Sequence, residues 1–138
     1  MKFEFSAGGV VFKKEHGKTL VLLSKHSGHH GWVFPKGIIG DTQKEESKED
    51  TAVREVKEET GIDAEIKSAL EPVTYWYDWE GKKVKKTVYY FVMTHLGGDI
   101  TDHDDEMEEV EWLMPEDVES RLTYPSDKKV WQEAKQYL

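Results

Sequence analysis

The sequence of 138 residues contains no cysteine, which excludes disulfides, thiolate zinc sites and a cysteine nucleophile. No apolar run approaches the ~20 residues that a membrane-spanning helix needs. The first residues, MKFEFSAGGVVF, lack the apolar core of a signal peptide and are typical of a strand. The chain also lacks internal repeats, low-complexity segments and linkers. These absences indicate one globular domain, residues 1–138, and are compatible with the cytoplasm.

Positive charge is in deficit as well. The chain has 19 Lys and Arg against 28 Asp and Glu, a net charge of −9. This balance disfavours broad electrostatic binding to nucleic acid or anionic membranes, so we expect neither a membrane nor a stable nucleic-acid partner. An acidic protein can still act on an anionic small molecule if divalent metal ions mediate the contact.

Strand-forming runs occur throughout the sequence. Two hairpins are predicted, the first joining FSAGGVVF to TLVLLSKH and the second joining AEIKSALEPVTYWY to KKVKKTVYYFVM. GWVFP and EEVEWL predict two more strands, whereas KGIIGDTQKEE is typical of a loop. TVYYFVM is apolar at successive positions, which predicts a strand covered on both faces.

Helix signals are clearest in SKEDTAVREVKEETG. Ser47 is a good N-cap, and Asp50 stands three positions later as in a capping box. Gly61 is a natural C-terminal stop, so the helix should run from about 48 to 60. PEDVESRL, opened by Pro115, and SDKKVWQEAKQYL predict two further helices. Mixed strands with three helices on two sides give an α/β sandwich.

The first of these helices carries a crowded acidic face. Glu55, Glu58 and Glu59 lie at i, i+3 and i+4, so their carboxylates share one side of the helix and repel one another. A solvated helix face usually alternates charge at this spacing, but here the one cationic partner is Arg54. The acidic stripe also borders the apolar side of the helix. Hard divalent cations would remove the repulsion, which favours a metal site over a solvated surface.

The spacing of these residues resembles the Nudix signature Gly-x5-Glu-x7-Arg-Glu-U-x-Glu-Glu-x-Gly-U, in which U is aliphatic. Gly40, Glu46 and the run REVKEETGI match every fixed position, giving a box at 40–62. The opening AGGVVF, the WVFPKG before the box and the late EVEWL also look like this family. The resemblance implies a Nudix-type α/β/α sandwich with a mixed central sheet and a catalytic loop-helix-loop. One departure is that Gly37, from the family's frequent PKG, lies nine residues before Glu46. Either Gly37 or Gly40 can therefore be the box glycine.

The resemblance also implies roles for individual residues. Hydrolysis of a nucleoside diphosphate linked to another group, with Mg²⁺ or Mn²⁺, is the expected reaction. The catalytic group would be Glu55, Glu58 and Arg54. Glu55 would orient or deprotonate the attacking water, and Arg54 would anchor the carboxylates, Glu58 in particular. The metal ligands would be Glu55, Glu58, Glu59 and, from the late acidic loop, Glu106, with Glu46 in support.

The substrate side is predicted from other segments. Lys36, Gly37 and Gly40 lie where the chain approaches the box, and Lys36 is expected to reach a phosphate. GWVFPKG, TYWYDWEGKKVKKTVYYFVM and RLTYPSDKKVW together look like Nudix enzymes that act on diadenosine polyphosphates. Further substrate-binding candidates are Tyr75, Tyr77 and Tyr89, which would stack on adenine, and Lys86, which with Lys83 and Lys85 would meet a polyphosphate. The alternative is that these aromatics are core and these lysines solvated.

Several functions stay open at this point. The first choice is a metal-dependent pyrophosphohydrolase that cleaves a dinucleoside polyphosphate, such as diadenosine tetra- or hexaphosphate, by water attack at phosphorus. Rivals with the same chemistry are a hydrolase of 8-oxo-dGTP-like triphosphates, of RNA 5′-pyrophosphates or of diphosphoinositol polyphosphates. A non-enzymatic nucleotide-sensing module is the other class. The partner is a small nucleotide polyphosphate, and the protein is expected to be a monomer or homodimer. The loop histidines His26, His29, His30 and His103 are expected to be solvated.

Overall fold

The computed structural model describes residues 1–40 and 45–138. Within them, eight strands form one sheet. The strands are β1 (Lys2–Glu15), β2 (Lys18–His26), β3 (Trp32–Val33), β4 (Lys36–Ile38), β5 (Ile62–Ala69), β6 (Val73–Trp79), β7 (Lys82–Gly98) and β8 (Met107–Leu113). The helices are α1 (Lys48–Thr60), α2 (Pro115–Arg121) and α3 (Pro125–Ala134), with 3₁₀ turns η1 (Ile100–Asp102) and η2 (Lys135–Tyr137).

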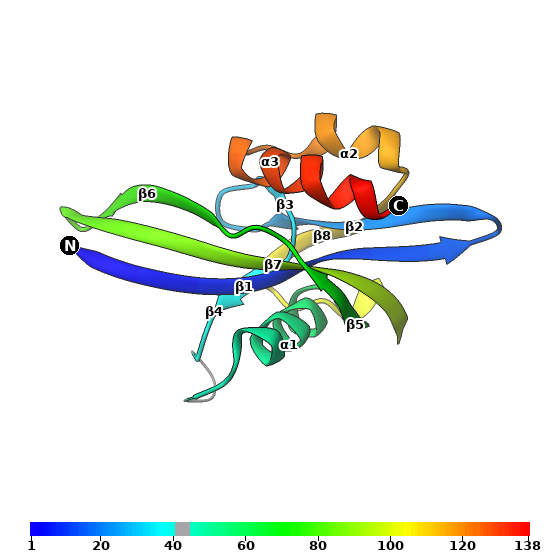
Figure 1. The fold of residues 1–138 in the computed structure, drawn as a ribbon, viewed down its shortest axis with the longest axis horizontal. Coiled ribbons are helices and arrows are strands. Elements are labelled where there is room, and N and C mark those ends of the chain that lie inside the picture. The colour runs from blue at the N-terminus through cyan, green and yellow to red at the C-terminus, as the bar shows by residue number, and fades with distance from the viewer. Residues whose placement is uncertain (41–44) are drawn as a thin grey trace.

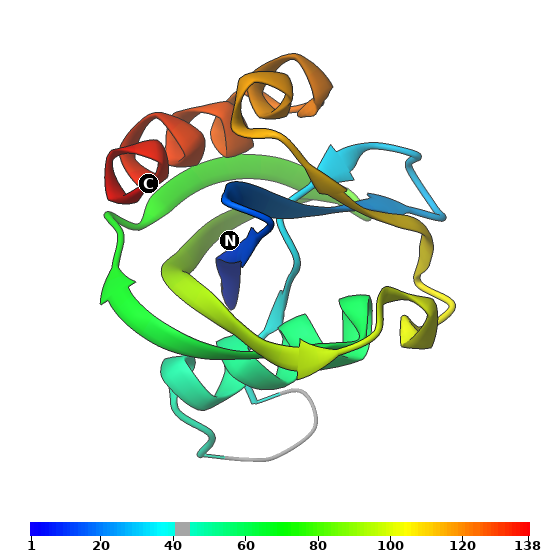
Figure 2. The ribbon, with the colours of Figure 1, turned by 90° about the vertical axis from the view of Figure 1, so that its right-hand side faces the viewer.

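The sheet is mixed, because the long strands β1 and β7 pair in parallel while every other pair of neighbouring strands in the described residues is antiparallel. Its main path runs β3-β2-β1-β7-β5, with β4 added to β1, β6 to β7 and β8 to β2. Helix α1 covers one face, and α2 and α3 cover the other (Figure 1). Figure 2 shows how strongly the sheet curls between these two helical layers. The predicted α/β/α sandwich is confirmed.

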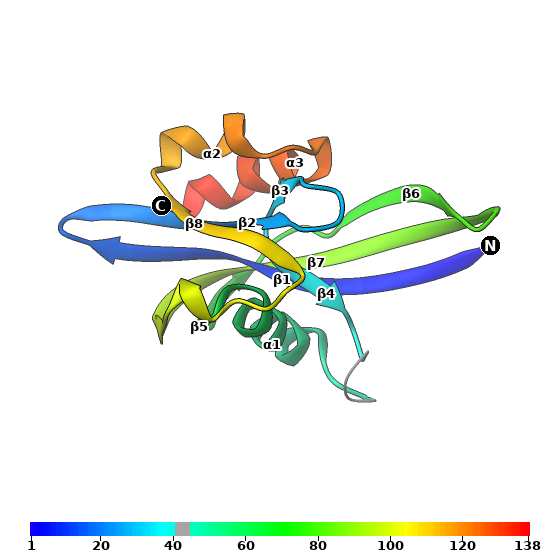
Figure 3. The same ribbon diagram turned by 180° about the vertical axis from the view of Figure 1, so that it is seen from behind.

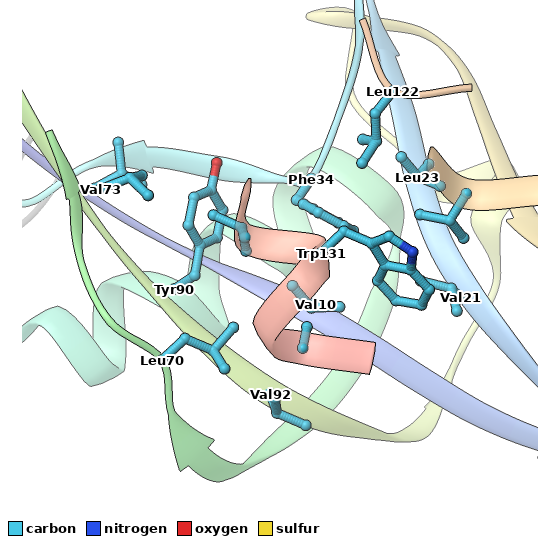
Figure 4. Close-up of a cluster of buried hydrophobic side chains, with 14 of the residues drawn as sticks. Val10, Val21, Leu23, Phe34, Leu70, Val73, Tyr90, Val92, Leu122 and Trp131 are labelled. Atoms are coloured by element: carbon cyan, nitrogen blue, oxygen red, sulfur yellow. The ribbon is translucent and has the colours of Figure 1, made fainter. Parts of the chain in front are cut away.

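Two hydrophobic clusters hold the layers together, one on each face of the sheet. Side chains alternate along a strand, so Val10 faces the α2–α3 layer and Val11 faces α1. On β7 the same alternation sends Tyr90 to the first cluster and Phe91 to the second, which explains why TVYYFVM is apolar throughout. Figure 4 shows the first cluster, in which Trp131 of α3 packs beside Phe34.

Most of the predicted elements are present, with two corrections. The hairpin from β1 to β2 is confirmed, and so is the helix at 48–60. The segment KGIIGDTQKEE was expected to be a loop, but Lys36–Ile38 pairs with β1 as β4. Residues 41–44 of that segment lie outside the described residues. Helix α3 begins at Pro125 itself, because proline fits the first turn of a helix. Among the described helices, none combines the length and apolarity needed to cross a bilayer.

Candidate active site

Local sequence fixes the position of α1. The Ser47 side chain accepts a hydrogen bond from Asp50 N at 3.0 Å, and Gly61 ends the helix in the left-handed conformation with φ 79°. Ala52 and Val56 bury the apolar side of the helix against the sheet. Helix α1 lies beside β1 and β4 (Figure 3), and Glu55 of the acidic stripe lies against Gly37 of β4.

Arg54 holds three carboxylates of the predicted site. Its Nε and Nη2 donate to Glu46 at 2.9 Å each, and its Nη1 donates to Glu55 at 2.7 Å and Glu58 at 3.1 Å. Glu46 also accepts a 2.7 Å hydrogen bond from the Thr51 hydroxyl. These hydrogen bonds from Arg54 keep the pKa of Glu46 below its ordinary value. Arg54 therefore anchors Glu46 most strongly, whereas the sequence had suggested Glu58.

Two glutamates of the stripe are buried rather than solvated. Glu55 is 5% and Glu59 4% exposed, while the Glu58 side chain is 45% exposed. Glu59 accepts a 3.4 Å hydrogen bond from Lys36 N. Burial raises the pKa of Glu59 well above its usual range; the Lys36 charge opposes this, and the Glu55 and Glu106 carboxylates add to it. A buried, mutually repelling pair of this kind is the electrostatic setting in which a cation is stabilised.

The structure separates the two candidate box glycines. A Cβ at Gly37 would lie 2.6 Å from Glu55 Cγ and closer still to its carboxylate, so any larger residue would displace the Glu55 side chain. Gly40 instead adopts φ 78°, a turn conformation that glycine accepts without strain. Gly37 thus makes the close approach to the acidic cluster, and Gly40 turns the chain.

A pocket of about 440 Å³ opens beside the acidic cluster. Glu55, Glu59 and Glu106 contribute carboxylates to it, while Lys36 and Lys86 contribute ammonium groups. Burial and the nearby Lys36 lower the pKa of Lys86, although its ion pair with Glu4 at 3.1 Å acts in the opposite direction. The pocket therefore joins a site that attracts cations to one that attracts anions.

A second pocket of about 480 Å³ adjoins the first, sharing His29, Val33, Lys36 and Tyr75 with it. It is more aromatic, since Tyr75, Tyr90 and Tyr124 line it around the carboxylate of Asp127. Asp127 is 4% exposed and accepts from Phe34 N at 3.3 Å. Burial raises the pKa of this carboxyl. Sequence reasoning missed Asp127, because no local pattern marks a helix-start aspartate as part of a pocket.

The strand registers divide the predicted aromatic and basic residues between two faces. Tyr75 pairs with Lys86, which pairs with Glu4, so all three side chains share the pocket face. Tyr77 lies on the same face and donates to Glu4 at 3.1 Å.

Tyr89 lies on the opposite face. It pairs with Ala7 there and packs with the α1 cluster, under the Lys48 ammonium at 5.1 Å. The sequence-based grouping of Tyr89 with Tyr75 and Tyr77 therefore needs correction. Lys83 and Lys85 also lie one residue out of phase with Lys86, and Lys85 sits over the Trp76 ring.

Two of the histidines that were expected to be solvated line the first pocket. His26, the last residue of β2, is half-buried, whereas His29 in the connection to β3 is exposed, as expected. Their rings stack with centroids 4.4 Å apart. His30 instead contacts Glu108 at 2.6 Å, and its ring is largely exposed. A signal was available in the sequence, because HSGHHG repeats the pattern His-x-Gly.

The acidic residues fit a hard divalent cation by their chemistry. Glu55, Glu58, Glu59 and Glu106 provide only carboxylate oxygens, the ligands that Mg²⁺ and Mn²⁺ prefer. Within residues 1–40 and 45–138, no three His, Asp or Glu side chains already form a metal-binding group. Arg54 instead holds Glu55 and Glu58. The donor set is therefore suitable, while the ligand arrangement is not preassembled.

With this geometry in view, comparisons with known proteins identify the family. The family description "NUDIX domain" matches residues 2–134. The chain belongs to the Nudix family. The resemblance inferred from the box is thus confirmed across nearly the whole chain.

Sequence relatives of this Nudix domain carry different names. It is 37% identical over 133 residues to a Mycobacterium tuberculosis protein named as mutator protein MutT4, covering 92% of this chain and 52% of the relative. It is 31% identical to the 8-oxo-(d)GTP phosphatase of Mycolicibacterium smegmatis, covering 91% and 39%. It is 29% identical to the asymmetrical bis(5′-nucleosyl)-tetraphosphatase of Rattus norvegicus, covering 86% and 79%. The chain therefore spans about half or less of the two mycobacterial relatives.

Among solved structures, a C. elegans Ap4A hydrolase in a binary complex superposes on this Nudix domain with a TM-score of 0.71. The match covers 97% of this chain and 96% of that one at 23% identity. At this level of identity the likeness supports the shared fold.

Proposed function

We propose that this protein is a metal-dependent pyrophosphohydrolase that cleaves phosphoric anhydride bonds of small nucleotides by water attack at phosphorus. The observation that carries the proposal is one pocket lined both by the buried carboxylates of Glu55 and Glu59 and by the lysines Lys36 and Lys86. A polyphosphate held by divalent cations is the ligand class that suits both groups, because the cations bind the carboxylates and the phosphates bind the lysines. Membership of the Nudix family supports the same reaction class.

Glu55, Glu58 and Glu59 would hold the metal, with Glu106 as a further ligand. Bound Mg²⁺ or Mn²⁺ would neutralise phosphate charge and acidify water. Arg54 fixes the carboxylates of Glu55 and Glu58 by direct hydrogen bonds. Buried Glu55, next to Gly37, is the candidate for orienting or deprotonating the attacking water.

The remaining groups would position the substrate. Lys36 and Lys86 line the same pocket as the carboxylates and would bind phosphate oxygens by charge-assisted hydrogen bonds. The adjoining aromatic pocket would take a nucleobase, because Tyr75 and Tyr124 offer ring surfaces and Asp127 offers a polar edge partner. Tyr75 borders both pockets, so a base and its phosphate chain could occupy them together.

For the substrate, we infer a dinucleoside polyphosphate of the diadenosine tetra- or hexaphosphate type. The two adjoining pockets support a base with an extended phosphate chain, and a relative at 29% identity is named a bis(5′-nucleosyl)-tetraphosphatase. The second candidate is an 8-oxo-dGTP-type triphosphate, favoured by the 31% identity to an 8-oxo-(d)GTP phosphatase. Action in the cytoplasm and a monomeric or homodimeric state stay predictions.

Product analysis with Mg²⁺ tests the proposal. The panel is diadenosine tetraphosphate and hexaphosphate, 8-oxo-dGTP, ADP-ribose and a diphosphoinositol phosphate. Release of ATP from the diadenosine compounds, lost in Glu58→Gln and kept in Glu49→Gln, is expected. Glu49 is an exposed glutamate in the first turn of the same helix, which makes it a matched control. Turnover of 8-oxo-dGTP alone would select the second candidate. Binding of nucleotide without turnover of any compound would mean a sensor module rather than an enzyme.

A further inference from the structure

The connection from β2 to β3 contains a short structural repeat. In HSGHHG, each glycine N–H donates to Nδ1 of the histidine two residues earlier, at 2.9 Å for Gly28 to His26 and 3.0 Å for Gly31 to His29. The two rings lie nearly parallel, with an interplanar angle of 7° and centroids 4.4 Å apart. Two consecutive turns therefore hold the two imidazole rings stacked face to face.

Close contacts favour glycine at both third positions. A Cβ at Gly28 would lie 3.0 Å from the His26 ring. A Cβ at Gly31 would lie 2.6 Å from Tyr124 Cε2 and 2.8 Å from His29 Nδ1. The positions of the two rings are thus fixed by hydrogen bonds from the backbone of the repeat and by packing against Tyr124.

The hydrogen bonds also fix where each ring carries its proton. A backbone N–H can only donate, so the Nδ1 that accepts from it must hold a lone pair. A neutral imidazole of this kind carries its hydrogen on Nε2. Partial burial and the nearby Lys36 charge lower the pKa of His29, which agrees with a neutral ring. Both histidines are therefore Nε2–H donors. The Nδ1 atom of each accepts from its turn, and that of His29 also accepts from the Tyr124 hydroxyl at 2.8 Å.

Both histidines border the pocket that contains Lys36, Glu55 and Glu59, and His29 also borders the aromatic pocket. We propose that His26 and His29 form a pair of neutral Nε2–H donors that bind phosphate oxygens between the acidic cluster and the aromatic pocket. This inference rests on the proposed function, because it assigns residues to the phosphate chain of that substrate. Neutral donors are suited to the position, since two stacked imidazolium ions would repel each other beside Lys36.

Asparagine substitutions isolate the proposed donors. In His26→Asn and His29→Asn, the side-chain oxygen can still accept the glycine N–H two residues on, as asparagine does in Asx turns. The turn is then kept, while the Nε2–H is lost. His16→Asn is the matched control, because His16 is exposed on the β1–β2 turn at φ 52°, a conformation that asparagine tolerates.

Steady-state kinetics and imidazole ¹⁵N NMR are measured together. With whichever compound of the panel the wild type hydrolyses, we expect KM to rise about tenfold in each pocket variant, the size of one hydrogen bond to a charged group, with kcat nearly unchanged. His16→Asn should match the wild type. The NMR spectra should show neutral Nε2–H rings at pH 7, whose Nε2 signals move when ADP is added.

The outcomes separate this inference from the proposed function. Wild-type turnover with unchanged KM in both variants overturns the histidine pair and leaves the hydrolase intact. Rings protonated on both nitrogens at pH 7, or on Nδ1 alone, also overturn it. If the wild type hydrolyses none of the panel, the proposed function fails, and the ADP-dependent Nε2 shifts alone decide: movement supports the pair, and its absence refutes it.

Discussion

Replacing Arg54 with methionine should destabilise the protein far more than the same change at a neighbouring lysine. The Arg54 side chain is 17% exposed and its partner Glu46 only 5%, so Arg54→Met leaves a buried carboxylate without its cation. Lys57 is the matched control on the same helix. Its ion pair with Asp63 spans 3.2 Å, but both side chains are about half exposed.

The expected magnitudes follow from this difference in burial. Removing one partner of a buried ion pair costs about 3–5 kcal/mol of stability. Because Arg54 is partly exposed, we expect the lower end of this range, about 3 kcal/mol. For a chain of this length that corresponds to a fall in Tm of about 10 °C. Lys57→Met should cost at most about 1 kcal/mol, the upper end for exposed pairs. Urea unfolding in EDTA at pH 7 measures both values, with an unchanged m-value as the two-state check.

The pH dependence provides a second test of the same argument. Arg54 keeps the pKa of Glu46 below its ordinary value in the folded state, so this contribution is present above the unfolded pKa of about 4.3. It is lost as pH falls through the folded pKa. The stability gap between wild type and Arg54→Met should therefore be complete at pH 6–7 and shrink below about pH 4. Equal costs for Arg54→Met and Lys57→Met, or a gap that widens in acid, would refute the reasoning.

Three other substitutions test separate parts of the molecule. Gly37→Ala should reduce kcat about 100-fold with little change in Tm, because its Cβ forces Glu55 to move by about 1 Å. Gly40→Ala should keep more activity and cost about 1 kcal/mol of stability, because Gly40 has a positive φ. Equal losses of kcat in the two variants would contradict this assignment. Asp127→Asn should raise KM for the hydrolysed nucleotide about tenfold by changing one base-edge hydrogen bond, and an unchanged KM would remove Asp127 from the nucleobase pocket. Ser47→Ala should lower the free energy of unfolding by about 1 kcal/mol through loss of the N-cap, measured by urea unfolding, and no change would mean that water replaces the cap.

The sequence predicted the fold class and the acidic helix because both depend on short-range rules. Capping at Ser47, termination at Gly61 and the i, i+3, i+4 spacing act within a few residues. The successive apolar residues of TVYYFVM likewise identified β7 as a strand covered on both faces. The short strand β4 was missed because its three residues depend on pairing with β1, and their local composition is that of a loop.

The assembly of the pocket depends on contacts between distant segments. Asp127 reaches Phe34 across 93 residues of chain, and no local pattern encodes that approach. Similarly, the register of β7 against β1 turns Tyr89 towards α1, while the pairing of β6 with β7 places Tyr75 on the pocket face. A shift of one residue would exchange these faces, and sequence alone does not fix it.

The sequence by itself therefore determined the family, the bounds of the acidic helix and the identity of its acidic residues, since each depends on the spacing of neighbouring side chains. Tertiary structure alone decided which glycine lies against Glu55, which tyrosine faces the pocket and how HSGHHG presents two histidines. Those outcomes depend on where packed strands and turns bring atoms within a few ångströms, a distance that sequence separation does not measure.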